Sequence, residues 1–229
     1  MAGKRTDARR KQHAQASVDD AAGQEARAEP TLARERIVVT AVELLDARGV
    51  AGLTMRELAE RLGSGVMSLY WHVSNKEEVL DLALDLVLEP PHCVEFGNWR
   101  EEVVHQLEDW RASMLRHPWS VSLLPRRALG PNLLSRLELL SRALSKAGVA
   151  DADVNAAIWS LWNHPVGATI TRVSFTLSDD DMAAGQRRLA RGSDRYKAIE
   201  QSRLLLDNDW DGAFRKGIDF LLDGFARAK

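Results

Sequence analysis

One short segment of the chain concentrates polar side chains that can bind phosphate oxygens or base edges. Ser68, Tyr70 and His72 lie within the run Gly-Val-Met-Ser-Leu-Tyr-Trp-His-Val-Ser-Asn-Lys. Lys76 ends this run, and an ammonium group beside a helix N-terminus attracts a phosphate. Arg56, earlier in the chain, has the length to reach the same surface. Groups of these types make the hydrogen bonds that place a protein on duplex DNA.

Two short helices that meet at a glycine must position these side chains. Thr54 and Glu57 have the spacing of a capping box, which predicts the start of a helix. Gly63 ends that helix because glycine takes a positive φ without steric cost, and a third helix is predicted roughly over 65–72. Ala59, four residues before Gly63, permits the close crossing of a helix-turn-helix. The core under this crossing is expected to contain Leu58, Leu62 and Leu69, with Ile37 and Leu44 beneath.

The exposed face of the third helix indicates how the segment would read DNA. Recognition helices put their first turn against base edges, and here that turn holds Val66, Met67 and Ser68. The Ser68 hydroxyl can hydrogen-bond to a base or a phosphate, whereas Val66 and Met67 can contact a thymine methyl group. Tyr70 and His72 lie beyond this turn, within reach of phosphate oxygens.

Each of these residues also has a purely structural interpretation. Tyr70 and Trp71 could be core aromatics. His72 could be an ordinary surface histidine, and Lys76 an ordinary charge at a helix start. Their combination on one face of a helix-turn-helix favours DNA contact over these separate explanations.

The rest of the chain predicts helices and no strands. Apolar residues recur at helical spacing from residue 31 onward. Ser74 and Glu77 repeat the capping-box spacing and open a fourth helix, and Asn98 with Glu101 opens a fifth. Asp151 is expected to cap a long helix. Further helices are predicted near 131–147, 151–177 and 209–227, with a loop that contains a short helix over 178–195.

These segments predict an all-α protein with two domains and an N-terminal arm. Residues 31–76 form a three-helix domain with the helix-turn-helix, and 77–229 form a larger helical bundle. Residues 1–30 contain one large aliphatic residue after the initiator Met, which is too few to bury a core, so a disordered arm is predicted. Its basic residues could touch a phosphate backbone or serve only as a solubilising tail.

The bulk composition limits the class of protein further. Hydrophobic residues make up 45% of the 229 residues, and the formal net charge of −2 does not by itself indicate nucleic acid. The single cysteine, Cys93, excludes an internal disulfide. No apolar segment follows the basic N-terminal residues, so a signal peptide is not expected. The uncharged stretch Val154–Thr171 contains Asn163 and Pro165 and is predicted to be a buried helix, which leads us to expect a cytoplasmic protein without membrane spans.

Several of these runs resemble the DNA-binding domain of TetR-family repressors, most closely the tetracycline-repressor branch. The matching runs are Leu53-Thr54-Met55-Arg56-Glu57-Leu58-Ala59, Leu62-Gly63, Leu69-Tyr70-Trp71-His72-Val73 and Asn75-Lys76. The close match covers about residues 31–90. It implies DNA contacts by Arg56, Val66, Met67, Ser68, Tyr70, His72 and Lys76. Val66 departs from the polar base-reading residue that is common at its position, so the tetracycline operator is not the expected target.

The resemblance also implies a homodimer and a small-molecule effector bound in the C-terminal bundle. The helices at 151–177 and 209–226 are the candidate dimer helices, the second because of the apolar spacing of Phe214, Ile218, Leu221, Leu222 and Phe225. Candidate effector-binding residues are His92, His105, Trp110, Leu124, Trp159, Trp162 and His164. His92 falls at the position of a pocket histidine. Leu124 falls where a magnesium-ligating histidine would stand, so a magnesium–tetracycline effector, a metal site and a cofactor are not expected.

The predicted function is a dimeric, ligand-responsive transcriptional repressor that a small molecule releases from a palindromic operator on double-stranded DNA. The sequence carries no activated nucleophile, no HExxH and no phosphate-binding glycine loop, so an enzyme is not expected. A helical adaptor that uses the same motif to bind protein is the remaining alternative.

Overall fold

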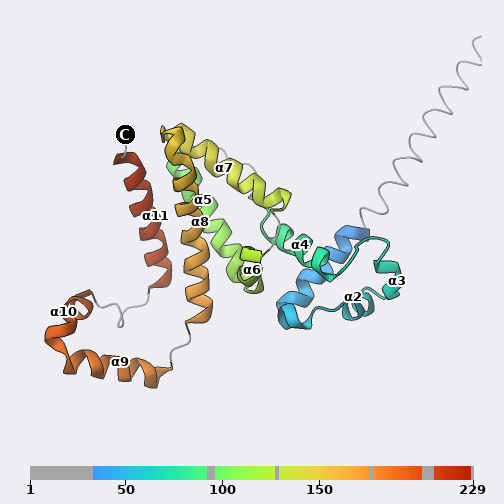
Figure 1. The fold of residues 1–229 in the computed structure, drawn as a ribbon, viewed down its shortest axis with the longest axis horizontal. Helices are drawn as coiled ribbons and strands as arrows, with labels where there is room; N and C mark the ends of the chain where they lie inside the picture. Colours follow the sequence, from blue (N-terminus) through green and yellow to red (C-terminus); the bar gives the residue numbers. More distant parts are fainter. Residues whose placement is uncertain (1–32, 92–95, 127–128, 176–177, 203–208, 228–229) are drawn as a thin grey trace, which may run out of the picture. The chain divides into compact units, whose positions relative to one another are not determined.

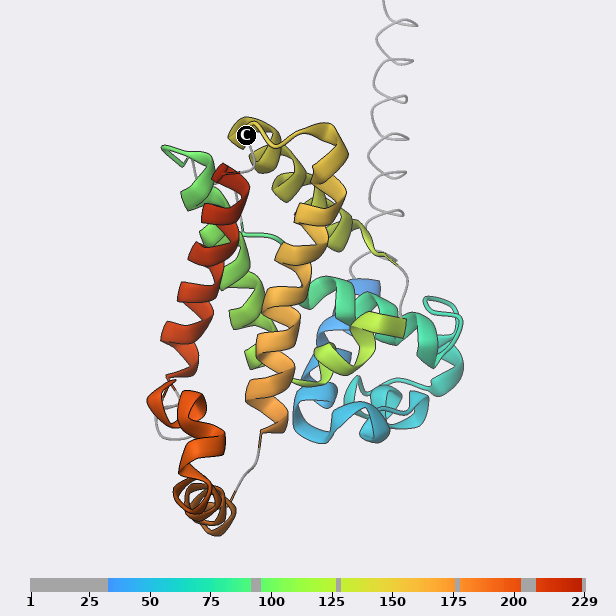
Figure 2. The ribbon, with the colours of Figure 1, turned by 60° about the vertical axis from the view of Figure 1, so that its left-hand side comes forward.

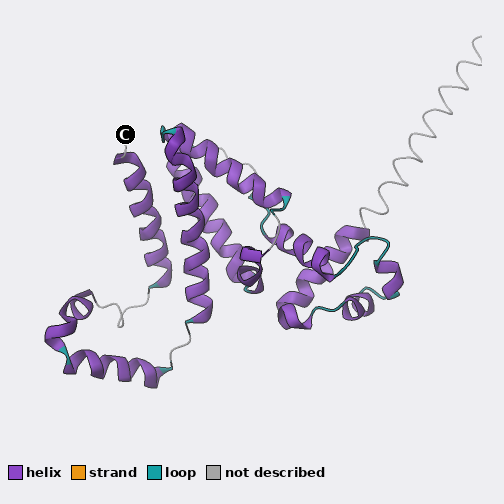
Figure 3. Ribbon diagram, viewed as in Figure 1, coloured by secondary structure: helices purple, strands orange, loops and turns teal. Residues whose placement is uncertain are grey.

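The computed structural model describes residues 33–91, 96–126, 129–175, 178–202 and 209–227. Within these ranges every regular element is a helix (Figure 1; Figure 3), which confirms the predicted all-α class. The chain divides into two compact units between Ala83 and Leu84. The predicted arm at 1–30 and the candidate His92 lie outside the described residues.

The first unit contains a helix at 33–52, then α2 (Met55–Arg61), α3 (Val66–Leu69) and the beginning of α4 (Lys76–Val87). Gly49, near the end of the first helix, has the left-handed φ of 66° expected at a helix end. The apolar stripe predicted for this helix is buried. The buried side chains of the unit include Ile37, Ala41, Leu44, Leu45, Leu53, Leu58, Ala59, Leu69, Val73, Val79 and Leu80.

Both ends of α2 are formed as the sequence predicts. The Thr54 hydroxyl accepts a hydrogen bond from the Glu57 amide at 3.1 Å. At the other end Gly63 has a φ of 65°. Its amide donates to the Glu60 carbonyl, and the Ser64 amide donates to the Ala59 carbonyl, both at 3.0 Å. This pair of bonds is a Schellman motif, which ends the helix and turns the chain toward α3.

The two elements that follow differ from the prediction in their bounds. The third helix ends at Leu69 instead of His72, so Tyr70, Trp71 and His72 lie in the turn after it. The cap of α4 is shifted by one residue because Asn75, not Ser74, caps the amide of Glu78 at 2.9 Å. The Glu78 carboxylate accepts in return from the Ser74 amide at 2.6 Å. The predicted start of this helix is confirmed, and Asn75 and Glu78 take part in its capping.

The second unit contains most of the chain's helices. They are α5 (Trp99–Arg116), α6 (Trp119–Leu123), the short 3₁₀ helix η1 (Leu124–Arg126), α7 (Pro131–Ala147), α8 (Asp151–Ser174), α9 (Asp179–Arg191), α10 (Ser193–Ser202) and α11 (Trp210–Arg227). The Asn98 side chain caps the Glu101 amide at 3.0 Å, as predicted. Asp151 does not cap α8, because Ala150 occupies the N-cap and Asp151 is already helical.

The region predicted as a loop over 178–195 is mostly helical. Ser178 and Asp181 form a reciprocal capping box that starts α9, and α10 follows after Gly192. Asp181 lies in the first turn of α9, where negative charge complements the helix dipole. In the order of the sequence, α9 and α10 connect α8 to α11 (Figure 1).

The core of the second unit lies among α5, α7, α8 and α11. α5 packs against α7 and α8, and α11 packs along α8 and α5, side by side with α8 in both views (Figure 1; Figure 2). The buried side chains include Val103, Leu107, Trp110, Met114, Leu140, Leu144 and Leu161. No helix within the described ranges has both the length and the apolar character needed to cross a membrane.

The sequence predicted that an apolar face of the last helix forms the dimer. In the structure this face packs mainly within its own subunit. Phe214, Ile218 and Leu222 are buried within the unit, because this face of α11 packs on α8 and α5. Phe220, on a different face of the same helix, is 67% exposed.

Replacing Gly63 with Ala should destabilise the first unit by about 1 kcal/mol, because an L-residue in the left-handed region is strained. A Cβ at Gly63 would meet nothing within 4 Å, so the cost is conformational and not a clash. Gly65→Ala is the matched control, since Gly65 has open space and a φ of −77°. Faster amide hydrogen exchange in α2 of the Gly63→Ala chain measures the effect. Equal exchange in both variants would contradict it.

Candidate DNA-binding site

A short helix and the turn after it present the side chains that the sequence predicts for DNA contact. Met67 is 76% exposed and Tyr70 46% exposed, and Ser68 is also exposed. Val66 is half-buried. We call Val66, Met67, Ser68, Tyr70, Trp71 and His72 the reading segment. Its side chains have the shape and polarity for apolar and hydrogen-bonding contact with a duplex groove.

Buried leucine and valine side chains hold the reading segment in place. Leu69 and Val73 are buried in the first unit, and the amides of His72 and Val73 both donate to the Leu69 carbonyl at 2.9 Å. Residues four apart face the same way in a helical turn. Trp71, midway between them, therefore points outward.

Trp71 is the residue that the sequence reasoning missed. Its side chain is 87% exposed, which rules out the core position considered for it and for Tyr70. The spacing of Leu69 and Val73 could have predicted this exposure. When two residues four apart are both buried, the residue midway between them, Trp71, lies on the opposite face. An indole on this surface offers both a flat apolar face and an N–H donor.

His72 and Lys76 are half-buried and have roles within the unit. His72 lines a small hollow of about 120 Å³ together with Ser68, Ser64 and Arg36. The Lys76 ammonium donates to the Val50 carbonyl at 3.1 Å, near the end of the first helix. Since an ammonium has further donors, this bond fixes Lys76 without using all of its hydrogens.

Positive charge around the reading segment is partly neutralised. Arg34 pairs with Glu78 and Arg48 with Glu57, each at 2.5 Å, and Arg61 lies 3.9 Å from Glu43. Arg56 is exposed on α2 and makes no ion pair within the part of the chain that the structure describes. Its guanidinium is therefore available to a phosphate.

Glu78 stabilises the turn between the reading segment and α4. The hydrogen bond from the Ser74 amide is the largest influence that holds the pKa of Glu78 below its ordinary value, with a further contribution from the positive charge of Arg34. Partial burial of the carboxylate opposes this lowering. The ionised carboxylate thus stabilises the folded turn.

The tryptophans proposed for effector binding meet in the second unit. The rings of Trp110 and Trp162 are 5.0 Å apart in an edge-to-face contact, and Trp159 lies 5.8 Å from Trp162. Trp110 is buried, Trp162 is half-buried and Trp159 is exposed. Leu124 is buried in η1.

Polar side-chain atoms on α5 are buried without hydrogen-bond partners among the described residues. Among them are the Trp110 indole N–H, the Gln106 amide oxygen and the His105 Nε2. Unsatisfied buried polar atoms are rare in folded proteins. His105 and Trp110 were predicted from the sequence, whereas Gln106 was not, although it lies one turn before Trp110 on the same helix face. His164 differs, since its Nε2 lies 2.8 Å from the Phe214 carbonyl and its ring stacks on that phenylalanine.

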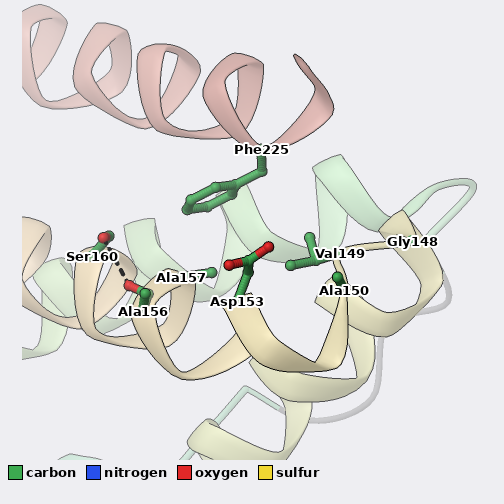
Figure 4. Close-up of a pocket in the computed structure, with 8 residues that line it drawn as sticks. All are labelled: Gly148, Val149, Ala150, Asp153, Ala156, Ala157, Ser160 and Phe225. Atoms are coloured by element: carbon green, nitrogen blue, oxygen red, sulfur yellow. Dashed lines mark hydrogen bonds between the residues drawn. The ribbon is translucent and has the colours of Figure 1, made fainter. Parts of the chain in front are cut away.

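A separate hollow of about 350 Å³ lies at one end of the second unit. Figure 4 shows Val149, Asp153, Ala157 and Ser160 below Phe225 of α11. None of the predicted effector-binding residues lines it. Across the described ranges, no three His, Cys, Asp or Glu side chains gather closely enough to hold a metal ion.

Two family models match most of the chain. Residues 37–83 match the model of the TetR family of bacterial regulatory proteins, and residues 93–228 match the tetracycline repressor-like C-terminal domain. An HTH-type transcriptional regulator of Saccharopolyspora erythraea is 39% identical over 208 residues and covers 88% of each chain.

Solved structures show the same fold. ActR of Streptomyces coelicolor, in complex with actinorhodin, has a TM-score of 0.73 and 27% identity over 85% of this chain and 95% of its own. BioQ with its double-stranded DNA operator has a TM-score of 0.60 and 28% identity over 85% of this chain and 98% of its own.

A helix-turn-helix unit followed by a helical bundle defines a bacterial DNA-binding regulator. The chain belongs to the TetR family of transcriptional regulators, which are DNA-binding proteins and not enzymes.

Glu78→Gln should weaken the first unit by about 1 kcal/mol at pH 7, because it removes a charged hydrogen-bond acceptor. Since the pKa of Glu78 is lowered on folding, its contribution is complete above the ordinary value and is lost as the pH falls through the lowered one. Denaturation of wild type and variant from pH 7 to pH 3 should therefore give converging stabilities. Glu60→Gln, an exposed carboxylate on α2, controls for loss of charge alone. A constant difference at every pH would contradict this role.

Proposed function

We propose that this protein is a dimeric repressor that binds a palindromic operator and leaves it when a small-molecule effector binds the helical body. The observation that carries this proposal is the exposed reading segment on its buried Leu69 anchor. Exposed apolar and aromatic side chains that gather on one surface, here Met67, Tyr70 and Trp71, favour an interaction site. A DNA duplex suits this surface as a partner, because Arg56, Lys76 and Ser68 lie nearby and can bind phosphate oxygens or base edges.

The roles of the individual side chains follow from their positions. Val66, Met67 and Ser68 occupy α3, whose N-terminal turn would face base edges in the major groove. Tyr70, Trp71 and His72 lie in the turn beyond, where they would contact the sugar–phosphate backbone. Arg56 on α2 and Lys76 at the start of α4 would bind phosphates on either side. We assign DNA binding to residues 31–76 and effector binding and dimerisation to 77–229.

The comparisons support both parts of the proposed function. BioQ has been crystallised with its DNA operator and ActR with actinorhodin, so this fold accommodates DNA and small molecules in related proteins. We infer that the present chain does the same and that it acts in the cytoplasm, where its operator would be.

Exposed apolar side chains on α8 and α11 support the proposed dimer. On α8 and just after it these are Trp159, Ile170, Val173 and Phe175, and on α11 the exposed one is Phe220. The two helices lie side by side within the subunit. A second copy related by twofold symmetry would cover both and form a four-helix interface.

We place the effector beside α5, α8 and η1. Trp110, Trp162 and Leu124 would supply apolar contacts, and the unpaired polar atoms of His105, Gln106 and Trp110 would supply hydrogen bonds. His92 stays a candidate on sequence grounds. Trp159 suits the dimer face better because it is exposed, and His164 already contacts Phe214.

Effector binding would act by a shift of populations. The half-sites of a palindrome lie about one helical turn apart, so both reading segments can bind only when their separation matches that repeat. An effector that binds better to a mismatched form removes the protein from DNA by favouring that form.

Arg56→Gln should reduce the salt dependence of operator binding. Each phosphate contact contributes about 0.9 to the slope of log affinity against log salt concentration, so the dimer should lose roughly twice that slope. The duplex is the palindrome that the wild-type chain selects from a random pool, and binding is measured by fluorescence anisotropy. Arg61→Gln, on the same helix but paired with Glu43, is the control. An unchanged slope for Arg56→Gln would remove this residue from the DNA-binding surface.

Phe220→Glu should weaken the dimer, since removing a carboxylate from water at the interface is costly even with Lys216, whose ammonium lies 5.4 Å from the centre of the Phe220 ring, as a neighbour. We expect association to weaken by about a hundredfold, measured by analytical ultracentrifugation. Leu134→Glu is the control, because Leu134 is an exposed apolar residue on α7, outside the proposed interface. If the Phe220→Glu chain remains as dimeric as wild type, the α8–α11 interface is wrong.

A further inference from the structure

The neighbouring helices α8 and α11 approach each other closely at one end of their contact. The ring of His164 on α8 stacks on that of Phe214 on α11, with 4.9 Å between the ring centres. A Cβ at Gly217 of α11 would come within 2.3 Å of the same imidazole ring. A residue without a side chain therefore permits this close approach of the two helices.

The two helices separate toward the other end of the contact. Gly224 lies two turns beyond Gly217 on the same face of α11, yet a Cβ there would meet nothing within 4 Å. The apolar stripe of α11 is also less covered at this end. Ile218 and Leu222 are buried, whereas Phe225, the next member of the stripe, is only half-buried.

The space between the separated ends is the hollow of about 350 Å³ that Figure 4 shows. We call it the α8–α11 hollow. Ala156 and Ala157 of α8 line it, and so do Gly148 and Val149 in the turn before that helix. These side chains are small, so they leave the space below Phe225 unfilled. A hollow of this volume accommodates a small organic molecule.

Asp153 is the charged member of the described residues that line the α8–α11 hollow. Its carboxylate lies below the Phe225 ring (Figure 4), and it makes no ion pair within the described ranges. Lys146, the nearest cation in the sequence, already pairs with Glu102 at 2.8 Å. The hollow thus combines a carboxylate that is not neutralised with an apolar wall and an aromatic ring.

We propose that the α8–α11 hollow binds a small hydrophobic ammonium ion. The Asp153 carboxylate supplies the opposite charge, and an aromatic ring such as that of Phe225 attracts an ammonium group through its face. The apolar body of the ligand would lie against Ala156 and Ala157, where its burial is favourable. None of the residues predicted to bind the effector lines this hollow, so the proposal goes beyond the proposed function and does not rest on it.

A small molecule fits this hollow better than a second copy of the chain does. The residues of α8 that line the hollow lie between Asp153 and Ser160, whereas Ile170 and Val173 of the proposed dimer face lie toward the other end of the helix. On α11, Phe225 continues the stripe that packs within the subunit, and the exposed Phe220 lies on a different face.

The test uses 2-phenylethylammonium as the probe and 2-phenylethanol as a neutral control of similar shape. In an NMR titration of the wild-type chain, the ammonium should shift the backbone amide signals of residues 148–160 and 224–225 and leave those around Trp110 unchanged. The alcohol should bind at least about threefold more weakly, because it lacks the charge that Asp153 and Phe225 attract. This difference should shrink at about 1 M salt, which screens exposed charges.

Two variants with matched controls separate the charge from the space. Asp153→Asn should weaken binding of the ammonium at least about threefold and leave binding of the alcohol unchanged. Asp151→Asn, at an exposed carboxylate in the same helical turn that does not line the hollow, is its control. Ala156→Leu should abolish binding of both probes by filling the hollow. Its control is Ala152→Leu, at an exposed alanine of α8 outside the hollow.

Three results would overturn the proposal. The first is amide shifts that centre on other residues or do not occur. The second is equal affinity of the wild-type chain for the two probes, or an Asp153→Asn chain that binds the ammonium as tightly as wild type does. The third is a change in the dissociation constant of the dimer in Asp153→Asn or Ala156→Leu, since this would indicate that a second copy covers the hollow. None of these measurements involves DNA, so their failure leaves the proposed function standing.

Discussion

The position of the reading segment depends on the burial of Leu69. α3 has four residues, and an isolated helix of that length is unstable in water. Burying one leucine contributes about 2 kcal/mol, and α2 supplies the surface because Ala59 is small and Gly63 turns the chain back with a φ of 65°. The contacts that hold Leu69 in place therefore also determine where Met67, Ser68 and Trp71 point.

Within the described ranges, several of the cations around this segment are paired with carboxylates, and Arg56 is not. Arg34, Arg48 and Arg61 each pair with a carboxylate, which ties the helices of the first unit together at modest energetic gain for exposed pairs. Arg56 has no such partner among the described residues. A chain with a formal net charge of −2 can thus approach DNA because its positive charge is local, not because it is basic overall.

The sequence predicted the motif well because its signals are local. Thr54 with Glu57, Gly63 and Asn98 with Glu101 each act over a few residues, and the structure confirms all of them. The predictions were wrong where either of two neighbouring residues could cap a helix, as with Ser74 and Asn75. They were also wrong where tertiary packing determines which surface a helix face contacts. Nothing in the spacing of Phe214, Ile218 and Leu222 says whether that face meets its own subunit or a second one. Cross-helix bonds such as Arg136 to Leu88 leave no sequence signal at all.

The two ends of α4 are capped in different ways. Its first turn is capped locally, by Asn75 and by Glu78 in return, so this end folds with the reading segment whatever the rest of the chain does. Its last turn is capped from a distance, by Ser113 and Arg136, so this end depends on how α5 and α7 are placed. The first turn of α4 is therefore fixed by neighbours in the sequence, whereas its last turn is fixed by residues that are distant in the sequence.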